Sequence, residues 1–252
     1  MPDSLAAVVL GAGAGERLRP LTRLLPKVLC PVDGVALVDG NLLRVQAVVG
    51  VGPASVAVNA HHGADLLGRH LAGRVHVSVE PDVALGTAGG VAHLRPWLDG
   101  RPALVVNGDT WSTVELRPVV DGWDGRRVRV VVAGEEAELR PGVRILGSLL
   151  PPDVIAELPH RPAGLYESCW RPAAAAGRLE VVARPGPCVP CDRPRDYLAA
   201  NLAASGGRSV VGRGAVVEGV LVRSVVWPGA TVRPGEVLVD AIRTPELTVL
   251  VR

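Results

Sequence analysis

The sequence has no phenylalanine, and Lys27 is the one lysine among its 27 basic residues. Aromatic residues make up only 3% of the 252 positions, and no apolar run approaches the roughly 18 residues needed to span a bilayer. The chain begins Met-Pro-Asp, which lacks the basic and then apolar segments of a signal peptide. We therefore expect a cytoplasmic protein with no membrane partner.

A large excess of either charge is also missing. The 27 basic and 25 acidic residues leave a net charge of +2, which excludes bulk electrostatic attraction to nucleic acid. Four cysteines are too few for a secreted disulfide scaffold. Cys188 and Cys191 form a CxxC pair, but a zinc site would need further ligands and a redox pair a thioredoxin-like context, so two buried thiols are favoured. The pair His61-His62 is more typical of solvated or core histidines than of a metal site.

Lysine is scarce because the chain favours arginine, as a mutational bias toward GC-rich codons would produce. A lysine that survives such a bias indicates a position that needs a compact, flexible ammonium instead of a planar guanidinium. Chance survival of Lys27 is the alternative.

Short apolar runs alternate with amphipathic segments in the first half of the chain. This order predicts an α/β fold with a mixed, mostly parallel sheet flanked by helices. Ligands bind at the carboxyl ends of such strands, where both Gly11 and Asp109 fall. The expected strands are 6–10, 54–58, 75–79, 103–106, 127–132 and 143–149, and the expected helices are 37–49, 64–71, 88–94, 163–175 and 195–204.

The composition changes after Gly206-Gly207, where aliphatic residues recur at every sixth position. This period predicts a short β-helix of two or three coils at about 18 residues per coil, and a set of antiparallel hairpins is the alternative. We expect one domain at 1–207 and the β-helix extension at 208–252. The recurring aliphatics are Val211 and Val217, and then Val220, Val226, Val232 and Leu238.

A glycine-rich loop, GAGAGERLRPLT at residues 11–22, follows the first expected strand. Glycines let backbone N–H groups approach a phosphate chain. A dinucleotide fingerprint would need glycine where Glu16 stands, and a P-loop would need Gly-Lys-Ser/Thr where Gly15 is followed by Glu16 and Arg17. The loop therefore fits neither motif, but it places Arg17 and Lys27 on either side of a possible phosphate chain.

The string GAGAGERLRPLT followed by Leu25-Pro26-Lys27 resembles the signature of sugar-1-phosphate nucleotidyltransferases. The strings LGTAGG at 85–90, VNGD at 106–109 and YLAAN at 197–201 match further family motifs in the same order. The resemblance is nearest to bacterial enzymes acting on mannose 1-phosphate or N-acetylmuramic acid 1-phosphate. It implies a Rossmann-like nucleotidyltransferase sheet, a short C-terminal left-handed β-helix, and Mg²⁺ as cofactor.

The resemblance also implies the reaction, in which a nucleoside triphosphate and a sugar 1-phosphate give a nucleotide sugar and pyrophosphate. Arg17, Lys27 and Asp109 would be catalytic, with Arg17 stabilising the departing pyrophosphate, Lys27 contacting a substrate phosphate and Asp109 binding Mg²⁺. Judged by its position alone, Asp109 could instead cap a helix. The implied nucleotide-binding residues are Leu10, Gly11, Ala12, Gly13, Gly15, Glu80, Gly86 and Thr87, and the implied sugar-phosphate-binding residues are Asn107, Gly147 and Glu167.

The pattern breaks at the family's second metal carboxylate. Pro190 stands where the family has this aspartate, and Asp192 follows two residues later. In an extended segment both side chains would point to the same face. Three hypotheses stay open: Asp192 replaces the lost metal ligand, the site works with one carboxylate, or the protein is catalytically weak.

The departure at Pro190 supports a second function, an inactive relative that binds nucleotide or a partner protein and regulates. Acyl transfer on the β-helix is a third possibility, but it would need a basic histidine, and the last histidine is His160. The base, the sugar and the oligomeric state stay open at the level of sequence, with a homo-oligomer possible.

Overall fold

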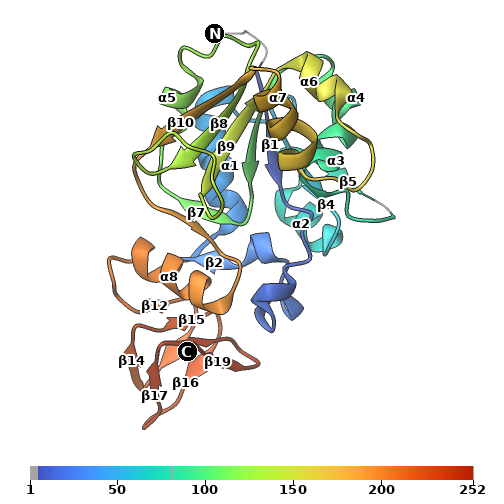
Figure 1. The fold of residues 1–252 in the computed structure, drawn as a ribbon. Helices are drawn as coiled ribbons and strands as arrows, with labels where there is room; N and C mark the ends of the chain where they lie inside the picture. The colour runs from blue at the N-terminus through green and yellow to red at the C-terminus, as the bar shows by residue number, and fades with distance from the viewer. Residues whose placement is uncertain (1–4, 81, 252) are drawn as a thin grey trace.

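A computed structural model describes residues 5–80 and 82–251 of the chain. Its centre is a seven-stranded sheet in the order β10-β8-β9-β6-β1-β4-β5 (Figure 1). Only β9 runs antiparallel to its neighbours, β6 and β8, so the predicted mixed, mostly parallel sheet is confirmed. The strands are β1 (Ala6–Leu10), β4 (Val56–Ala60), β5 (His76–Val79), β6 (Ala103–Asn107), β8 (Val128–Ala133), β9 (Ile145–Leu150) and β10 (Leu179–Arg184).

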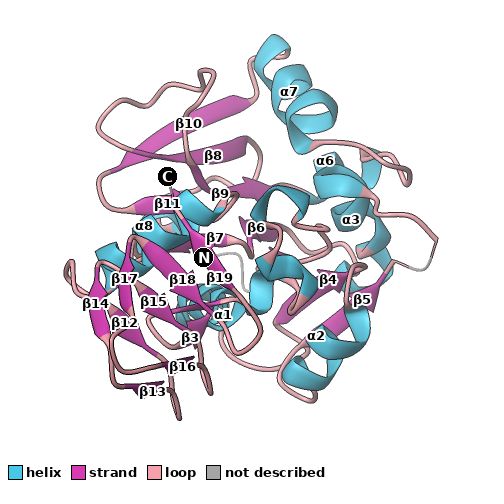
Figure 2. Ribbon diagram, turned by 90° about the horizontal axis from the view of Figure 1, so that it is seen from below, coloured by secondary structure: helices cyan, strands magenta, loops and turns pink. Residues whose placement is uncertain are grey.

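Helices cover both faces of this sheet, with α1 and α2 on one side and α3, α6 and α7 on the other (Figure 2). Alternate residues of β1 therefore enter different cores: Ala7 and Val9 pack with α1, and Ala6 and Val8 pack with α3. This two-sided burial explains why the strand sequence is continuously apolar. The helices are α1 (Leu37–Val49), α2 (Ala64–Leu71), α3 (Gly86–His93), α4 (Arg95–Leu98), α5 (Arg117–Val120), α6 (Pro152–Glu157), α7 (Arg171–Ala175) and α8 (Pro194–Ala204).

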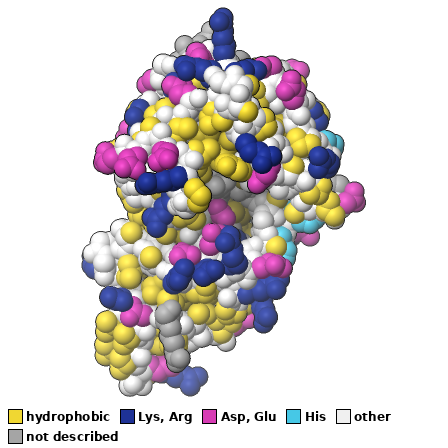
Figure 3. Space-filling view, in the orientation of Figure 1, with side chains coloured by type: hydrophobic (Ala, Val, Ile, Leu, Met, Phe, Trp, Pro, Cys, Tyr) yellow, Lys and Arg dark blue, Asp and Glu magenta, His cyan; other side chains and the backbone are white. Residues whose placement is uncertain are grey.

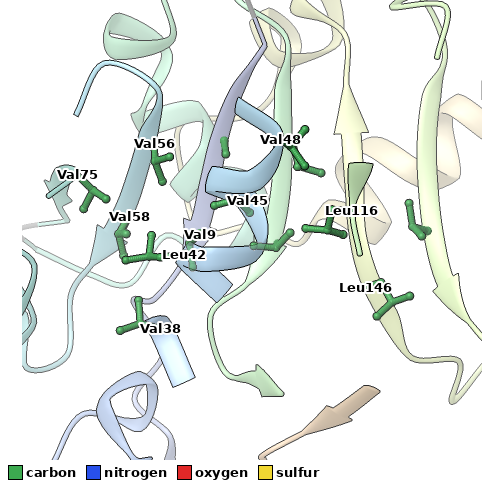
Figure 4. Close-up of a cluster of buried hydrophobic side chains, with 14 of the residues drawn as sticks. Val9, Val38, Leu42, Val45, Val48, Val56, Val58, Val75, Leu116 and Leu146 are labelled. Carbon is green, nitrogen blue, oxygen red and sulfur yellow. The ribbon is translucent and has the colours of Figure 1, made fainter. Parts of the chain in front are cut away.

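Helix α1 has the bounds that the sequence predicts. Its buried side chains recur at helical spacing, as at Val38, Leu42 and Val45, and Figure 4 shows them packed against valines of β1 and β4. None of the helices in residues 5–80 and 82–251 has the length and apolar character to cross a membrane.

Two short strand pairs lie outside the large sheet and carry functional segments. The antiparallel pair of β7 (Thr110–Ser112) and β11 (Cys188–Pro190) joins the chain just after Asp109 to the chain just before Asp192. The hairpin of β2 (Pro31–Val32) and β3 (Val35–Ala36) follows the short 3₁₀ turn Lys27–Leu29.

The prediction of one regular α-helix over 163–175 is wrong. The structure has a π-helical turn at Tyr166–Trp170, and α7 begins only at Arg171. Pro172 lacks the N–H that a regular α-helix would bond to the carbonyl of Ser168, so the α-helical ladder is interrupted there.

The C-terminal segment forms coils of parallel strands, which confirms the predicted β-helix against the hairpin alternative. Val210 pairs with Val225 and Val225 with Ile242, so the two coils span 15 and 17 residues, shorter than expected. A Cβ at Gly219 would lie 2.4 Å from the Glu236 carbonyl oxygen, which explains the glycine between coils. The strands are β12 (Val210–Val211), β13 (Val216–Val217), β14 (Val220–Val222), β15 (Val225–Val226), β16 (Thr231–Val232), β17 (Val237–Val239), β18 (Ala241–Arg243) and the antiparallel β19 (Thr248–Leu250).

The coils pack on the rest of the chain through buried Tyr197 of α8. The Trp227 indole Nε1 of the coils donates a hydrogen bond of 2.9 Å to the Tyr197 hydroxyl, which donates to the Pro31 carbonyl. Asn201, one helical turn later, accepts from the Asp33 backbone N–H at 3.0 Å. The family string YLAAN therefore joins three parts of the fold, and the boundary at 207/208 stays a prediction.

Candidate functional site

A cleft of about 440 Å³ opens at the carboxyl ends of β1, β4 and β6. Figure 3 shows this face hollowed between the part with the large sheet and the part with α8 and the coils, with basic and acidic side chains around the hollow. The predicted residues that line the cleft are Leu10, Ala12, Gly13, Arg17, Gly86, Thr87, Asn107, Asp109 and Asp192.

The glycine-rich loop is shaped by contacts behind it and is open in front. The Gly11 N–H donates 2.7 Å to the Asn59 side-chain oxygen, and a Cβ on Gly11 would lie 2.9 Å from the Asn59 carbonyl. Gly15 has a φ of 63°, and its Cβ would lie 2.9 Å from the Cβ of Lys27. Gly13, in contrast, has open space around it and can admit a ligand. Gly11 and Gly15 thus shape the cleft without lining it.

Lys27 is nearly buried and holds two carboxylates together. Its Nζ donates to Asp109 Oδ2 at 2.5 Å and to Asp192 Oδ1 at 2.7 Å. Burial on its own would lower the pKa of Lys27, but Asp109 and then Asp192 raise it above its ordinary value. The ammonium therefore stays charged while it draws the two acids to one point.

Arg17 reaches the same group from the solvent side. Its Nη2 lies 3.1 Å from Asp192 Oδ1, and its side chain is 67% exposed. An exposed guanidinium can leave this contact at small cost and follow an incoming phosphate. The carboxylate pair thus contacts one fixed cation, Lys27, and one movable cation, Arg17.

The strand pair of β7 and β11 places Asp192 beside Asp109. The Cys191 N–H donates 3.0 Å to the Asp109 carbonyl, and Pro190 lies opposite Thr110 in the strand register. The side chain of Asn41 donates 2.9 Å to the Thr110 carbonyl and fixes β7 from α1. Asp192 consequently lies beside Asp109, and its role as a second metal carboxylate stays a prediction.

The two aspartates suit a hard divalent cation. Carboxylate oxygens are preferred Mg²⁺ ligands, and Mg²⁺ commonly uses one or two of them together with substrate phosphates. Within residues 5–80 and 82–251, no cluster of three or more histidine, cysteine or acidic side chains could hold a metal alone. The donor set fits a cation that arrives with a phosphate substrate.

Glu80 is placed behind the cleft and does not line it. Its side chain accepts from Asn59 Nδ2 and from the Leu85 N–H, each at 2.7 Å, and the residue is 1% exposed. A Cβ at Gly90 would lie 2.5 Å from Asn59 Nδ2. Glu80 therefore links the start of α3 to the glycine-rich loop through Asn59.

The string LGTAGG has a packing role at two further glycines. A Cβ at Gly86 would lie 2.6 Å from the Ala163 carbonyl oxygen, and one at Gly89 would lie 2.4 Å from that of Arg161. The hydroxyl of Thr87 accepts 2.8 Å from the Leu165 N–H. These contacts hold the segment before the π-helical turn against α3.

A second pocket of about 190 Å³ lies beside the cleft, and all three predicted sugar-side residues, Asn107, Gly147 and Glu167, line it. Tyr166 and Trp170 of the π-helical turn form part of its wall. The two spaces are adjacent and share part of a wall, because four residues line both: Leu10, Thr87, Asn107 and Ile145.

Comparison with known proteins identifies the family of the chain. The model of the nucleotidyl transferase family matches residues 6–138, which is more than half of the chain. The chain belongs to this family. N-acetylmuramate α-1-phosphate uridylyltransferase of Caulobacter vibrioides is 31% identical over 77% of this chain and 95% of its own. Mannose-1-phosphate guanylyltransferase of Mycobacterium tuberculosis is 32% identical over 50% of this chain and 36% of its own.

The fold of this nucleotidyltransferase also matches solved structures. A protein from Thermus thermophilus described as a mannose-1-phosphate geranyltransferase superposes with a TM-score of 0.72 at 18% identity, over 98% of this chain and 95% of that one. The match covers the large sheet and extends into the coils, which supports the fold alone at this level of identity.

Sequence reasoning did not single out several residues that line the two spaces, among them Asn59, Arg144, Tyr166 and Trp170. Asn59 is the second-to-last residue of a buried strand, close to the position of Asn107 at the end of β6, and that position was a usable signal. The rarity of their residue types was a usable signal for Tyr166 and Trp170, because the chain has only 2 tyrosines and 5 tryptophans. Arg144 gave no signal among so many arginines.

The CxxC cysteines are buried, and the first residue of the histidine pair contacts the backbone. Cys188 and Cys191 are buried free thiols, and burial raises the pKa of Cys188 to about 11. His61 contacts the Glu80 carbonyl through Nδ1 at 2.7 Å. Neither pair belongs to a metal-binding cluster among the described residues.

Proposed function

We propose that this nucleotidyltransferase joins a nucleoside triphosphate to a sugar 1-phosphate, giving a nucleotide sugar and pyrophosphate. The observation that carries the proposal is the convergence of Arg17, Lys27, Asp109 and Asp192 at a cleft that shares a wall with a second pocket. The larger space suits a nucleotide and the smaller one suits a pyranose ring.

In the reaction, a phosphate oxygen of the sugar 1-phosphate attacks the α-phosphorus of the triphosphate. The new O–P bond forms as the bond to the β-phosphate bridging oxygen breaks, and that oxygen leaves with pyrophosphate. The nucleophile is already an anion, so no general base is needed. The protein must orient two polyanions and offset the charge that develops between them.

Each charged residue has a distinct part in this scheme. Lys27 is fixed by burial and orients Asp109 and Asp192, while Arg17 follows the β- and γ-phosphates and stabilises the departing pyrophosphate. Asp109 and Asp192 would hold Mg²⁺, which when bound lowers the repulsion between the substrates. Gly13 and the neighbouring backbone of Leu10 and Ala12 would lie along the nucleotide.

The smaller pocket would hold the sugar. Asn107 and Glu167 offer polar contacts to ring hydroxyls, and Tyr166 and Trp170 offer apolar surface to the ring face. We include N-acetylmuramate α-1-phosphate and mannose 1-phosphate among the candidate substrates, because the names of two relatives refer to them.

A turnover matrix tests the proposal. Each nucleoside triphosphate is combined with each member of a panel of sugar 1-phosphates in the presence of Mg²⁺, and pyrophosphate release is measured. We expect release with at least one pair and its loss when the cation is chelated. Nucleotide binding without release from any pair would contradict the proposal and favour a regulatory nucleotide-binding protein.

A further inference from the structure

Arg144 stands immediately before β9, on the wall of the larger cleft between Val143 and Ile145. Its backbone carbonyl accepts 2.8 Å from the Ala133 N–H, and its side-chain Nη1 donates 2.9 Å to the Cys188 carbonyl. Arg144 is exposed, and this bond to a neutral partner orients its guanidinium; within residues 5–80 and 82–251 its other N–H donors make no hydrogen bond and are left for a ligand.

The charges of the cleft leave Arg144 without an acidic partner. Lys27 and Arg17 are paired with Asp109 and Asp192, as described above. Within residues 5–80 and 82–251, no carboxylate oxygen lies within the 4.0 Å of an ion pair from Arg144. Of the charged residues that line the cleft, Arg144 is the cation with its charge uncompensated in this part of the chain.

Arg144 also lies where the two spaces meet. The next residue, Ile145, lines both the cleft and the smaller pocket, and Gly147 on the same strand lines the smaller pocket. A sugar in the smaller pocket with its phosphate directed at the cleft would bring that phosphate to the side of Arg144. Arg17 approaches from the glycine-rich loop, which is a separate wall.

We propose that Arg144 binds the phosphate of the sugar 1-phosphate and so holds the nucleophile, an inference that rests on the proposed function. A guanidinium can bind two phosphate oxygens at once, and the bond to the Cys188 carbonyl fixes its direction before substrate arrives. The binding is specific to the second substrate, because the triphosphate is gathered by Arg17 and the glycine-rich loop.

The test compares Arg144→Gln and Arg144→Lys with the matched control Arg140→Gln. Arg140 lies four residues earlier, is exposed and pairs with Glu136, so its loss should leave the kinetics unchanged. We expect Arg144→Gln to raise the KM for sugar 1-phosphate by about 10- to 100-fold, with the KM for the triphosphate within about twofold. Arg144→Lys should raise this KM less, because lysine keeps the positive charge but lacks the planar guanidinium that binds two phosphate oxygens.

A purely structural role for Arg144 would give a different result. Loss of its bond to Cys188 could loosen β11 and displace Asp192, which would change kcat and the Mg²⁺ concentration needed for half-maximal rate. An unchanged KM for sugar 1-phosphate, or an equal rise in both KM values, would overturn the inference.

Failure of the proposed function is separable from failure of this inference. If the wild-type chain releases no pyrophosphate with any substrate pair, titration calorimetry with inorganic phosphate replaces kinetics. Phosphate binding that is present in the wild type and Arg140→Gln but lost in Arg144→Gln supports the anion site. Absent binding in the wild type, or equal binding in all three proteins, overturns it.

Discussion

Asp192 and Asp109 share the ammonium of Lys27, at 2.7 and 2.5 Å, although they come from distant parts of the sequence. This contact bears directly on the loss of the family's aspartate at Pro190. The segment is not extended as the sequence predicts, because the Asp192 N–H donates 2.9 Å to the Pro190 carbonyl and the chain turns at Cys191. Pro190 and Asp192 nevertheless both line the cleft, and the pairing of β7 with β11 brings Asp192 beside Asp109.

The first prediction concerns the two carboxylates. If both hold the cation, Asp109→Asn and Asp192→Asn should each lower kcat by about 100-fold or more at fixed Mg²⁺, since each removes a charge that acts on the transition state. Asp153→Asn is the control, because Asp153 is exposed, pairs with Arg178 and does not line the cleft. Normal turnover in Asp192→Asn would leave a site with one carboxylate.

The second prediction concerns the shape of the cation at position 27. Lys27→Arg keeps the charge, but the wider guanidinium must fit where the Lys27 stem touches Gly15 and is almost fully buried. We expect a loss of kcat of at least about tenfold, because the planar fork cannot satisfy both carboxylates in the same geometry. Arg23→Lys, the reverse change at a nearby position, is the control, and wild-type kinetics in Lys27→Arg would contradict the prediction.

The third prediction concerns the hydroxyl of Tyr197, which joins Trp227 to Pro31. Tyr197→Phe removes the hydroxyl and leaves the Trp227 indole N–H buried without a partner. We expect unfolding in urea to show a loss of about 1–3 kcal/mol. Tyr166→Phe, at a half-exposed tyrosine, should change the free energy of unfolding by less than about 0.5 kcal/mol. Equal stability of the two variants would refute the role of the buried hydroxyl.

The fourth prediction compares two helical glycines. Gly90→Ala places a methyl group 2.5 Å from Asn59 and 2.9 Å from Glu80, so it should destabilise the fold by about 1–3 kcal/mol. Gly68→Ala in α2 meets open space, and alanine should stabilise that helix by up to about 1 kcal/mol. Thermal unfolding of both variants checks the opposite signs, and a stabilised Gly90→Ala would show that Asn59 and Glu80 move freely.

The fifth prediction concerns the four buried thiols. Burial raises the pKa of Cys30 and of Cys169 to about 12, well above the ordinary 9.0, so little thiolate forms in the native protein. Reaction with a disulfide reagent at pH 8 should be slow in the native state and complete in urea. Because the unfolded chain loses these protons first, the free energy of unfolding should fall as the pH rises above about 9. Rapid reaction of the native protein would contradict the burial.

The sequence predicts those parts of the fold that depend on local patterns. The apolar run Ala6–Leu10 and the helix Leu37–Val49 were bounded correctly, because burial on two faces or on one helical face leaves a clear period. The helix over 163–175 was misjudged because a π-helical turn depends on packing against α3 and on Pro172, which periodicity does not register.

The candidate site is likewise predictable where it follows local motifs and not where it depends on pairing between distant segments. Motif order was enough to indicate Arg17, Lys27 and Asp109 as one group. The position of Asp192 was left open because it depends on pairing between β7 and β11, which are far apart in the chain. Glu80 was expected at the base side, but its hydrogen bonds to Asn59 and Leu85 place it behind the cleft.

The link from Trp227 through Tyr197 to Pro31 ends four residues after Lys27. The family match stops at residue 138, yet Tyr197 and its cover of Val210, Val225 and Ile242 lie beyond it. Truncation before the coils would expose the Tyr197 ring to water and loosen the peptide that runs from Pro31 back to Lys27. We therefore expect a chain that ends before the coils to hold the Lys27 ammonium less firmly, although the coils lie outside the matched region.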